Sequence, residues 1–266
     1  MDPRAWQEQR SSFGAAADLY DRVRPNYHEA AIRWALDGVG GTVVDLGAGT
    51  GILSRQLVSS GYRCIPIEPD SAMRTRCDDR MREVFGAAFL KAHSGSAVRI
   101  PRTLDGSAER IPMPDASVAA VVAGQAYHWF DPARADPEIA RVLRPGGVFA
   151  PLWNIRDETG PWVAELTKVL RSQDGSGIHA GWQGMSLDDH FDTTEQATFR
   201  FAVRHTPDSL VELLRSRSYY LTGSPQRRML LERSLRDLLA THSDLAGREE
   251  FDLPYVTVAY RARRKP

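Results

Sequence analysis

The stretch from Val43 to Gly51 has the residue types and spacing of a ligand-binding turn. Two β-branched residues lead into Asp45, and glycine then occupies alternate positions at Gly47, Gly49 and Gly51. Glycine lacks a Cβ atom and adopts positive φ freely, so such a backbone can approach a ligand closely. The residues that follow have the pattern of a helix start. A strand, a glycine turn and a helix N-terminus together predict a nucleotide-type site.

Three interpretations of this turn compete. A turn without a ligand is disfavoured by three glycines that follow an acid. A dinucleotide site requires G-x-G-x-x-G, with its third glycine at the position of Ile52, one residue later than Gly51. The third interpretation is a cofactor without phosphate, whose amino-acid end carries an ammonium and a carboxylate. Asp45 would then order the ammonium, and glycine N–H groups would face the carboxylate.

Four segments in order carry a family resemblance. Asp45-x-Gly47-x-Gly49-x-Gly51 resembles the first motif of class I S-adenosylmethionine-dependent methyltransferases. Glu68 ends the second strand, where an acid accepts hydrogen bonds from ribose hydroxyls. Residues 106–112 look like the family's adenine loop, and residues 114–117 and 143–147 match the segments before strands four and five. The resemblance covers about residues 40–155, while residues 78–100 depart from the compact relatives.

This resemblance implies S-adenosylmethionine as the cofactor. Its expected contacts are Tyr20, Arg24, Asp45, Gly47, Gly49, Gly51, Glu68, Pro69, Met73, Ser107, Ala108, Glu109 and Gln125. Many relatives have aspartate at the position of Ser107, so that contact departs from the family pattern. For Arg24, a surface position without contact to the cofactor is an equally good interpretation.

The reaction is expected after strand four, at Gln125 to Phe130, because ligands of open α/β sheets bind beyond the carboxyl ends of the strands. This stretch is similar to small-molecule methyltransferases of the trans-aconitate and ubiquinone/menaquinone types. His128 is the candidate general base, and the alternative is a neutral, hydrogen-bonding histidine. Phe130 is better explained as core. Candidate acceptor contacts are Tyr127, Trp129, Asn154, Arg156 and Trp182.

Strands alternate with helices, which predicts an α/β fold: a Rossmann-like, seven-stranded, mostly parallel sheet with helices on both faces. The expected strands are 42–47, 63–67, 98–104, 118–123, 148–153, 199–205 and an antiparallel last strand, 255–261. A helical cap over the acceptor is expected after strand five. The chain is therefore expected to divide into three segments. These are a helical segment at 1–40 that closes over the cofactor, a cofactor-binding core at 41–155, and residues 156–266 with the remaining strands and the cap.

The amino-acid composition limits which classes of partner and which cellular location are expected. The chain has 266 residues with 34 basic and 34 acidic side chains, and this balance disfavours nucleic acid as a partner. Two cysteines and a polar N-terminus predict a cytoplasmic protein without disulfides or a signal peptide. No membrane-length apolar run and no metal-ligand spacing occur. A monomer or a homodimer is expected.

The expected function is methyl transfer from S-adenosylmethionine to oxygen, nitrogen or carbon of a small molecule. An NAD-dependent dehydrogenase is one alternative. A non-catalytic S-adenosylmethionine-binding protein is another, which the polar and aromatic stretch at residues 125–129 argues against. An RNA or protein methyltransferase is disfavoured by the neutral charge.

Overall fold

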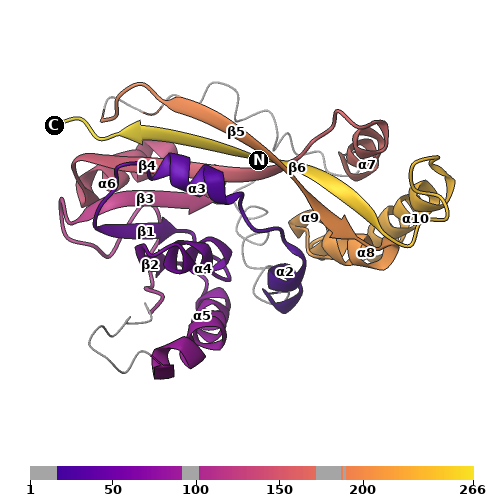
Figure 1. Cartoon of the computed structure of the whole chain (residues 1–266), viewed down its shortest axis with the longest axis horizontal. Coiled ribbons are helices and arrows are strands. Elements are labelled where there is room, and N and C mark those ends of the chain that lie inside the picture. The colour runs from indigo at the N-terminus through magenta and orange to yellow at the C-terminus, as the bar shows by residue number, and fades with distance from the viewer. Residues whose placement is uncertain (1–16, 92–101, 172–186, 188–189) are drawn as a thin grey trace. The chain divides into compact units, whose positions relative to one another are not determined.

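The computed structural model describes residues 17–91, 102–171, 187 and 190–266, and their strands form one sheet. The strands are β1 (Thr42–Leu46), β2 (Arg63–Ile67), β3 (Val118–Gly124), β4 (Leu143–Arg156), β5 (Glu195–His205) and β6 (Phe251–Arg263). Their order in the sheet is β2-β1-β3-β4-β6-β5 (Figure 1).

The helices lie between these strands as an α/β fold requires. They are α2 (Ala17–Val23), α3 (Glu29–Ala35), α4 (Ile52–Ser59), α5 (Ser71–Lys91), the 3₁₀ helix η2 (Tyr127–Trp129), α6 (Pro132–Val142), α7 (Pro161–Arg171), α8 (Pro207–Arg215), α9 (Ser218–Leu221) and α10 (Pro225–Thr241). Proline stands at the start of α6, α8 and α10. The N–H of a residue at this position has no hydrogen-bond partner within the helix, so proline, which lacks the N–H, is tolerated there.

The sheet is mixed. β1 pairs in parallel with β2 and with β3, and β3 pairs in parallel with β4. β6 runs antiparallel to β4, because the N–H of Gly146 donates to Arg264 while the N–H of Asp157 donates to Pro254. The parallel pairs and the antiparallel last strand agree with the sequence prediction.

The predicted number of seven strands is not confirmed, because the sheet of the described residues has six. The missing strand is the one expected at residues 98–104. Residues 98–101 lie outside the described part of the chain, and Leu104 forms only an isolated parallel bridge with Ile67.

Helices cover both faces of the parallel strands. Val44 and Leu46 belong to the same buried core cluster as Ile139 of α6. Asp45, between them on β1, instead bonds Ser54 of α4. Since successive side chains of a strand point to opposite faces, α6 and α4 lie on opposite sides of the sheet. This confirms the expected arrangement.

The described residues divide into two compact units. One, here called the sheet unit, consists of residues 26–91, 102–153, 187, 190–199 and 257–266. The other, here called the helical unit, consists of residues 17–25, 154–171 and 200–256. The expected division of the chain at residues 40 and 155 stays a prediction.

The helical unit has a leucine-rich core of its own. α8 and α10 both belong to this unit, as α7 does (Figure 1). The apolar face of α10 is buried in this core at four leucines: Leu231, Leu235, Leu238 and Leu239.

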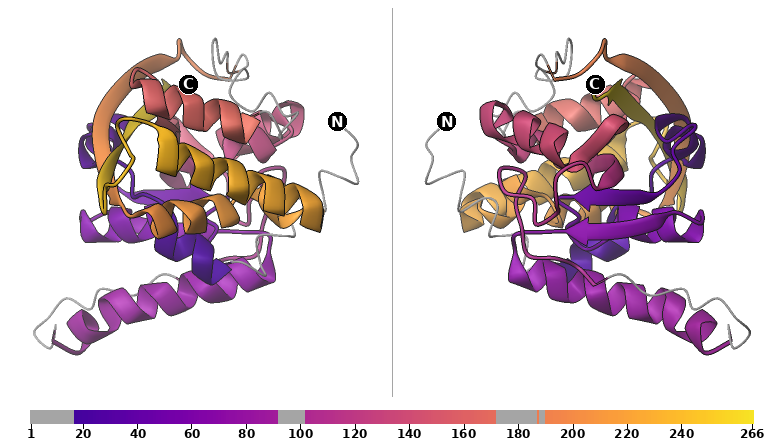
Figure 2. Two further views of the ribbon diagram at one scale, coloured as in Figure 1. Left: turned by 90° about the vertical axis from the view of Figure 1, so that its right-hand side faces the viewer. Right: turned by 90° about the vertical axis from the view of Figure 1, so that its left-hand side faces the viewer.

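In the sheet unit, α5 is one continuous helix of 21 residues (Figure 2). The carboxylate of Asp70 accepts a hydrogen bond from the N–H of Met73 at the start of α5, which caps the helix. No helix among the described residues is both long and apolar enough to cross a membrane.

Candidate functional site

The turn between β1 and α4 has the backbone that its glycines predict. Gly47, Gly49 and Gly51 have φ of 70°, 57° and 81°. Side chains at the first and last positions would also collide with the protein. A Cβ on Gly47 would lie 2.7 Å from the Cβ of Ala126, and one on Gly51 would lie 2.5 Å from the Sγ of Cys77. A Cβ on Gly49 would meet nothing within 4 Å, so the backbone there borders open space.

The N–H groups of the turn are used inside the protein, which differs from the expectation that they face a ligand carboxylate. Those of Gly47 and Ala48 donate to the carbonyl of Ile67 at 2.9 and 3.0 Å, and that of Gly51 donates to the carbonyl of Ala48. The N–H of Gly49 donates to Oε2 of Glu68 at 3.0 Å. The glycines therefore serve close approach and a fixed turn shape in place of anion binding.

Asp45 is held beneath this turn with half of its carboxylate satisfied. It is 1 % exposed, and its Oδ2 accepts a hydrogen bond from the hydroxyl of Ser54 at 2.5 Å. Its Oδ1 is buried and has no hydrogen-bond partner among the described residues. Burial raises the pKa of Asp45 to about 7, Ser54 opposes this, and the charge of Glu68 adds to it. A cationic donor at Oδ1 would restore the ionised form.

Thr50 presents a second unsatisfied oxygen in the turn itself. Its side chain is 1 % exposed, and its Oγ1 is buried with no hydrogen-bond partner among the described residues. Because buried polar atoms are nearly always hydrogen-bonded, two such oxygens within six residues point to a ligand that supplies the partners. Sequence reasoning missed Thr50 and Ser54, although both are hydroxyl residues next to the glycine pattern.

Glu68 connects the turn to the end of β2. It is buried, and its two carboxylate oxygens accept the N–H groups of Gly49 and Asp70 at 3.0 and 2.9 Å. The structure thus brings Glu68 to the glycine turn, as predicted. Pro69 follows it with its carbonyl bonded to Arg74, and the side chain of Met73 is buried on α5.

Both cysteines lie on the elements around Asp45. Cys77 of α5 stands against Gly51, and Cys64 of β2 interacts with Asp45 and with the hydroxyl of Ser54. Both thiols are free and buried. Burial raises the pKa of Cys77 to about 12 and raises that of Cys64 as well, so both are neutral at physiological pH.

The predicted adenine loop forms a tight turn. Ser107 and Arg110 form an isolated antiparallel bridge, and Ala108 is buried in the core cluster of the sheet unit. The carboxylate of Glu109 accepts the N–H of Asp131, the residue that precedes α6. Glu109 thus has a structural partner in addition to its predicted ligand role.

Gln125 follows β3 in a strained conformation. Its φ is 54°, which costs a residue with a side chain about 1–2 kcal/mol. Its N–H donates to the carbonyl of Leu152, so the ladder with β4 continues through it. Strain of this kind gathers at functional sites, which agrees with the predicted ligand contact.

The aromatic stretch after Gln125 divides into packing and candidate reactive residues. The hydroxyl of Tyr127 donates to the buried carboxylate of Asp136 on α6 at 3.0 Å, and its ring packs against Phe130 and Phe149. These contacts help to attach α6, and the predicted role of Tyr127 in acceptor binding stays a prediction. Phe130 packs against the core cluster, as expected.

His128 and Trp129 remain the candidates for contact with the acceptor. Both lie in η2, which ends two residues before the N-cap of α6 at Asp131. Neither side chain is buried, and their ring centroids are 4.8 Å apart.

Three further predicted contacts, Arg24, Asn154 and Arg156, lie in the helical unit. Arg24 donates to the carbonyl of Ser216 at 3.4 Å, and the side-chain amide of Asn154 donates to the carbonyl of Pro25 at 3.2 Å. Arg156 donates through Nε to the hydroxyl of Thr167 at 3.2 Å. Tyr20 lies in α2, but its side chain is outside the described part of the chain, as is the whole of Trp182.

No group of three or more histidine, cysteine, aspartate or glutamate side chains that could hold a metal ion occurs among the described residues. The candidate site is therefore built from the carboxylates Asp45 and Glu68, the glycine turn and the stretch after β3.

Comparison with known sequences identifies relatives over nearly the whole chain. The family model described as a methyltransferase domain matches residues 44–150. An uncharacterized methyltransferase of Mycobacterium tuberculosis is 41 % identical over 253 residues, which are 94 % of this chain and 95 % of the relative. An uncharacterized methyltransferase of Schizosaccharomyces pombe is 28 % identical, over 93 % of this chain and 94 % of the relative.

A solved structure from Anaeromyxobacter dehalogenans, whose description names a type II methyltransferase, has the same fold with a TM-score of 0.61. It is 25 % identical, and the match covers 91 % of this chain and 97 % of that one. The similarity thus extends beyond the cofactor motifs to the helices and strands that follow them.

Proposed function

The chain belongs to this family of methyltransferases, and we propose that it transfers a methyl group from S-adenosylmethionine to a small-molecule acceptor by in-line substitution. S-adenosylmethionine, when bound, supplies a methyl group on a positively charged sulfur. Substitution at that carbon requires the acceptor atom to lie opposite the sulfur. The chain's own residues therefore contribute mainly alignment and the exclusion of water.

The observation that carries the proposal is the buried, unpartnered Oδ1 of Asp45. An ammonium group supplies the hydrogen bond that this oxygen lacks, together with the positive charge that favours the carboxylate form. A neutral ligand would leave a buried charge or require Asp45 to stay protonated. The open space beside Gly49 gives such a ligand room to approach the backbone.

The remaining residues would hold the other parts of the cofactor. Each carboxylate oxygen accepts up to two hydrogen bonds, so Glu68 suits the ribose hydroxyls while it also fixes the turn. Pro69 and Met73 would line the same end. Ser107, Ala108 and Glu109 would contact adenine.

At the acceptor, we propose His128 as the general base, with Gln125 and Trp129 as neighbours that orient the acceptor. An acceptor hydroxyl or amine has to lose a proton, and a neutral imidazole can take it. A carboxylate acceptor is already ionised and needs no base. Whether oxygen, nitrogen or carbon is methylated thus decides whether His128 acts in proton transfer.

Thermal unfolding with each candidate cofactor tests the proposed donor. A ligand that binds only the folded protein stabilises it by about 2.7 kcal/mol at a hundred times its Kd, which raises Tm by several degrees for a chain of this size. We expect S-adenosylhomocysteine to raise Tm and NAD to leave it unchanged. Stabilisation by NAD alone would favour the dehydrogenase and overturn the proposal.

Transfer itself is tested with S-adenosylmethionine that carries a labelled methyl group, offered with panels of small carboxylates, phenols and amines. We expect label in at least one acceptor class. Binding of S-adenosylhomocysteine without transfer to any class would favour the non-catalytic alternative. The two measurements thus separate the methyltransferase from both of its rivals.

A further inference from the structure

A carboxyl group is buried on α6, the helix that follows the proposed reactive segment. Asp136 is 3 % exposed, and it lies on the buried face of α6 together with Ile139 and Ala140. A buried polar group is unfavourable unless hydrogen bonds replace those that it made with water. A carboxyl group among apolar side chains therefore requires a specific partner.

One such partner is the side chain of Tyr127, the first residue of η2. Its hydroxyl lies 3.0 Å from Oδ1 and 3.1 Å from Oδ2 of Asp136, so it can donate to either oxygen. Its ring packs edge-on against Phe130 and tilted against Phe149 of β4, with centroids 5.7 and 5.5 Å apart. Both the ring and the hydroxyl of Tyr127 are thus held by the sheet unit.

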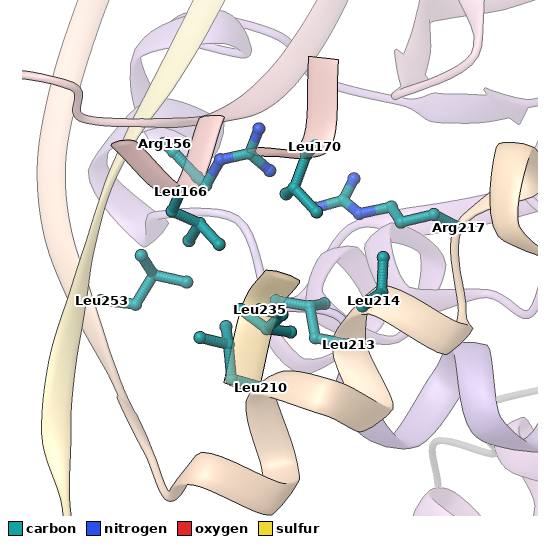
Figure 3. Close-up of a pocket in the computed structure, with 9 residues that line it drawn as sticks. All are labelled: Arg156, Leu166, Leu170, Leu210, Leu213, Leu214, Arg217, Leu235 and Leu253. Atoms are coloured by element: carbon teal, nitrogen blue, oxygen red, sulfur yellow. The ribbon is translucent and has the colours of Figure 1, made fainter. Parts of the chain in front are cut away.

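Another charged side chain beside apolar residues, Arg156, has different surroundings. It borders a space lined by leucines of α7, α8, α10 and β6 (Figure 3). Its Nε donates to the hydroxyl of Thr167, and the negative charge of Glu158 acts favourably on it. These neighbours all belong to the helical unit, whereas Asp136 contacts the segment that carries His128.

η2 is short, so its direction depends on contacts outside it. Within the segment, the N–H of Trp129 donates to Ala126 and the N–H of Phe130 donates to Tyr127, which closes a single turn. A 3₁₀ helix has three residues per turn, so neighbouring side chains point about 120° apart. When Tyr127 points toward α6, the directions of His128 and Trp129 are therefore set as well.

The segment is also fixed at its beginning. The N–H of Gln125 donates to the carbonyl of Leu152 on β4 at 2.8 Å. η2 is therefore held between β4, through Gln125, and α6, through Tyr127. Loss of the bond to Asp136 would release one of these two attachments while the sheet itself stays paired.

We propose that Asp136 is a positioning residue, which acts through Tyr127 and directs His128 toward the acceptor. The inference rests on the proposed role of His128 as the general base. Proton transfer requires the base to lie about 2.6–3.2 Å from the atom that gives up the proton, and a displacement of about 1 Å costs a factor of about 100 in rate. The bond between Asp136 and Tyr127 fixes η2 firmly enough to hold such a distance.

The first experiment follows the His128 ring by NMR and needs no acceptor. The chain has seven histidines, and the imidazole C–H signals of His128 are those that disappear in His128→Gln. Asp136→Ala and Tyr127→Phe both remove the hydrogen bond, so both should shift and broaden these signals. Asp136→Asn should keep them near their wild-type positions, because the amide oxygen accepts the same bond.

The matched control is Ile139→Val, on the same buried face of α6. It removes one carbon from the core and no hydrogen bond, so the His128 signals should stay in place. Tyr127→Phe keeps the aromatic ring, so it decides the result if Asp136→Ala does not fold. Unchanged His128 signals in Tyr127→Phe, or an equal shift in the control, would overturn the positioning role.

The second experiment measures methyl transfer to a hydroxyl or amine acceptor from the labelled-methyl screen. In Asp136→Ala, kcat should fall at least tenfold while the affinity for S-adenosylhomocysteine stays within twofold, and Asp136→Asn should recover most of the rate. Full turnover in Asp136→Ala, with turnover lost in His128→Ala, would contradict the positioning role alone. Full turnover in His128→Ala would end the base role, and the NMR result would then decide whether Asp136 sets the direction of the ring.

Discussion

At the scale of single residues, Asp45 is the most deeply buried carboxylate of the described chain. Burial outweighs the hydrogen bond from Ser54, so the pKa rises to about 7. Near neutral pH the free protein is thus a mixture of protonated and ionised forms. A cationic ligand at Oδ1 would select the ionised form and release the proton.

We therefore predict a pH-dependent stability that Asp45→Asn removes. The folded pKa lies above the unfolded value of 3.8, so the stabilising contribution is complete below about pH 4 and disappears as pH rises through about 7. The loss amounts to at most about 4.5 kcal/mol, since one pKa unit corresponds to about 1.4 kcal/mol. Urea unfolding at several pH values measures it. Wild-type and variant curves with the same slope would contradict the predicted pKa.

The same variant tests the ligand contact. Asparagine offers no negative charge to an ammonium group, so Asp45→Asn should bind S-adenosylhomocysteine at least tenfold more weakly. Calorimetry in buffers of different protonation enthalpy should show proton release on binding near pH 6.5 for the wild type and none for the variant. Proton release that persists in the variant would assign it to another group.

For His128 we predict that alanine removes turnover and preserves cofactor binding. A general base typically contributes a factor of about 10²–10⁴, so kcat should fall by that range when the acceptor is a hydroxyl or an amine. Single-turnover methyl transfer and S-adenosylhomocysteine titration measure the two effects separately. His190→Ala, an exposed position, serves as the control. Full activity in His128→Ala would end the proposed role.

The sequence predicts those site residues whose type and position next to a strand end are enough to suggest a role. Asp45, Glu68 and the three glycines meet at one turn because strand ends of a parallel sheet meet at one edge. The structural role of Tyr127 depends on Asp136, a partner on the following helix. The lowered pKa of Arg156 depends in part on the positive charge of Arg217, 61 positions further along the chain. Such contacts arise from tertiary packing, so no local sequence pattern predicts them.

At the scale of elements, the turn between β1 and α4 has two kinds of glycine. Gly47 and Gly51 are enclosed, and any side chain there would displace Ala126 or Cys77. Gly49 borders open space, so the absence of a side chain there leaves room for a ligand. Gly47 and Gly51 are therefore needed for folding, whereas Gly49 is available for ligand binding.

Gly49→Ala should fold with a modest loss of stability and bind S-adenosylhomocysteine at least tenfold more weakly. Alanine at positive φ costs about 1–2 kcal/mol, and its methyl group would enter the space left for the ligand. The control is Gly61→Ala after α4, because Gly61 also has a positive φ, 86°, and an unobstructed Cβ direction. Its stability should fall similarly while its affinity stays unchanged. Equal affinities for the two variants would show that Gly49 does not border the ligand.

Element boundaries followed from the sequence wherever a cap and a proline stood together. Thr206-Pro207 and Ser224-Pro225 start α8 and α10, and the hydroxyl of each cap residue accepts a hydrogen bond from an N–H of the first turn. Of the strand expected at 98–104, the described residues show only the bridge between Leu104 and Ile67. A pattern of apolar residues indicates burial, and it does not show whether a segment pairs with a neighbouring strand.

At the scale of the whole molecule, charge is balanced, with 34 basic and 34 acidic side chains and an isoelectric point near 7.1. We predict a solubility minimum close to pH 7, because molecules without net charge repel one another least. Solubility in polyethylene glycol, measured from pH 5.5 to 9 at low salt, should rise on both sides of the minimum. A monotonic curve would show that local patches, and not net charge, control association.

The placement of both cysteines around Asp45 has a practical consequence. Alkylating reagents attack the thiolate, and these two thiols are neutral and enclosed, Cys77 directly against Gly51. Labelling therefore requires the turn to open, and its rate reports that opening in the unmodified protein. Since the chain has only these two cysteines, mass spectrometry of the labelled protein follows this one region, and a ligand that closes it slows the reaction.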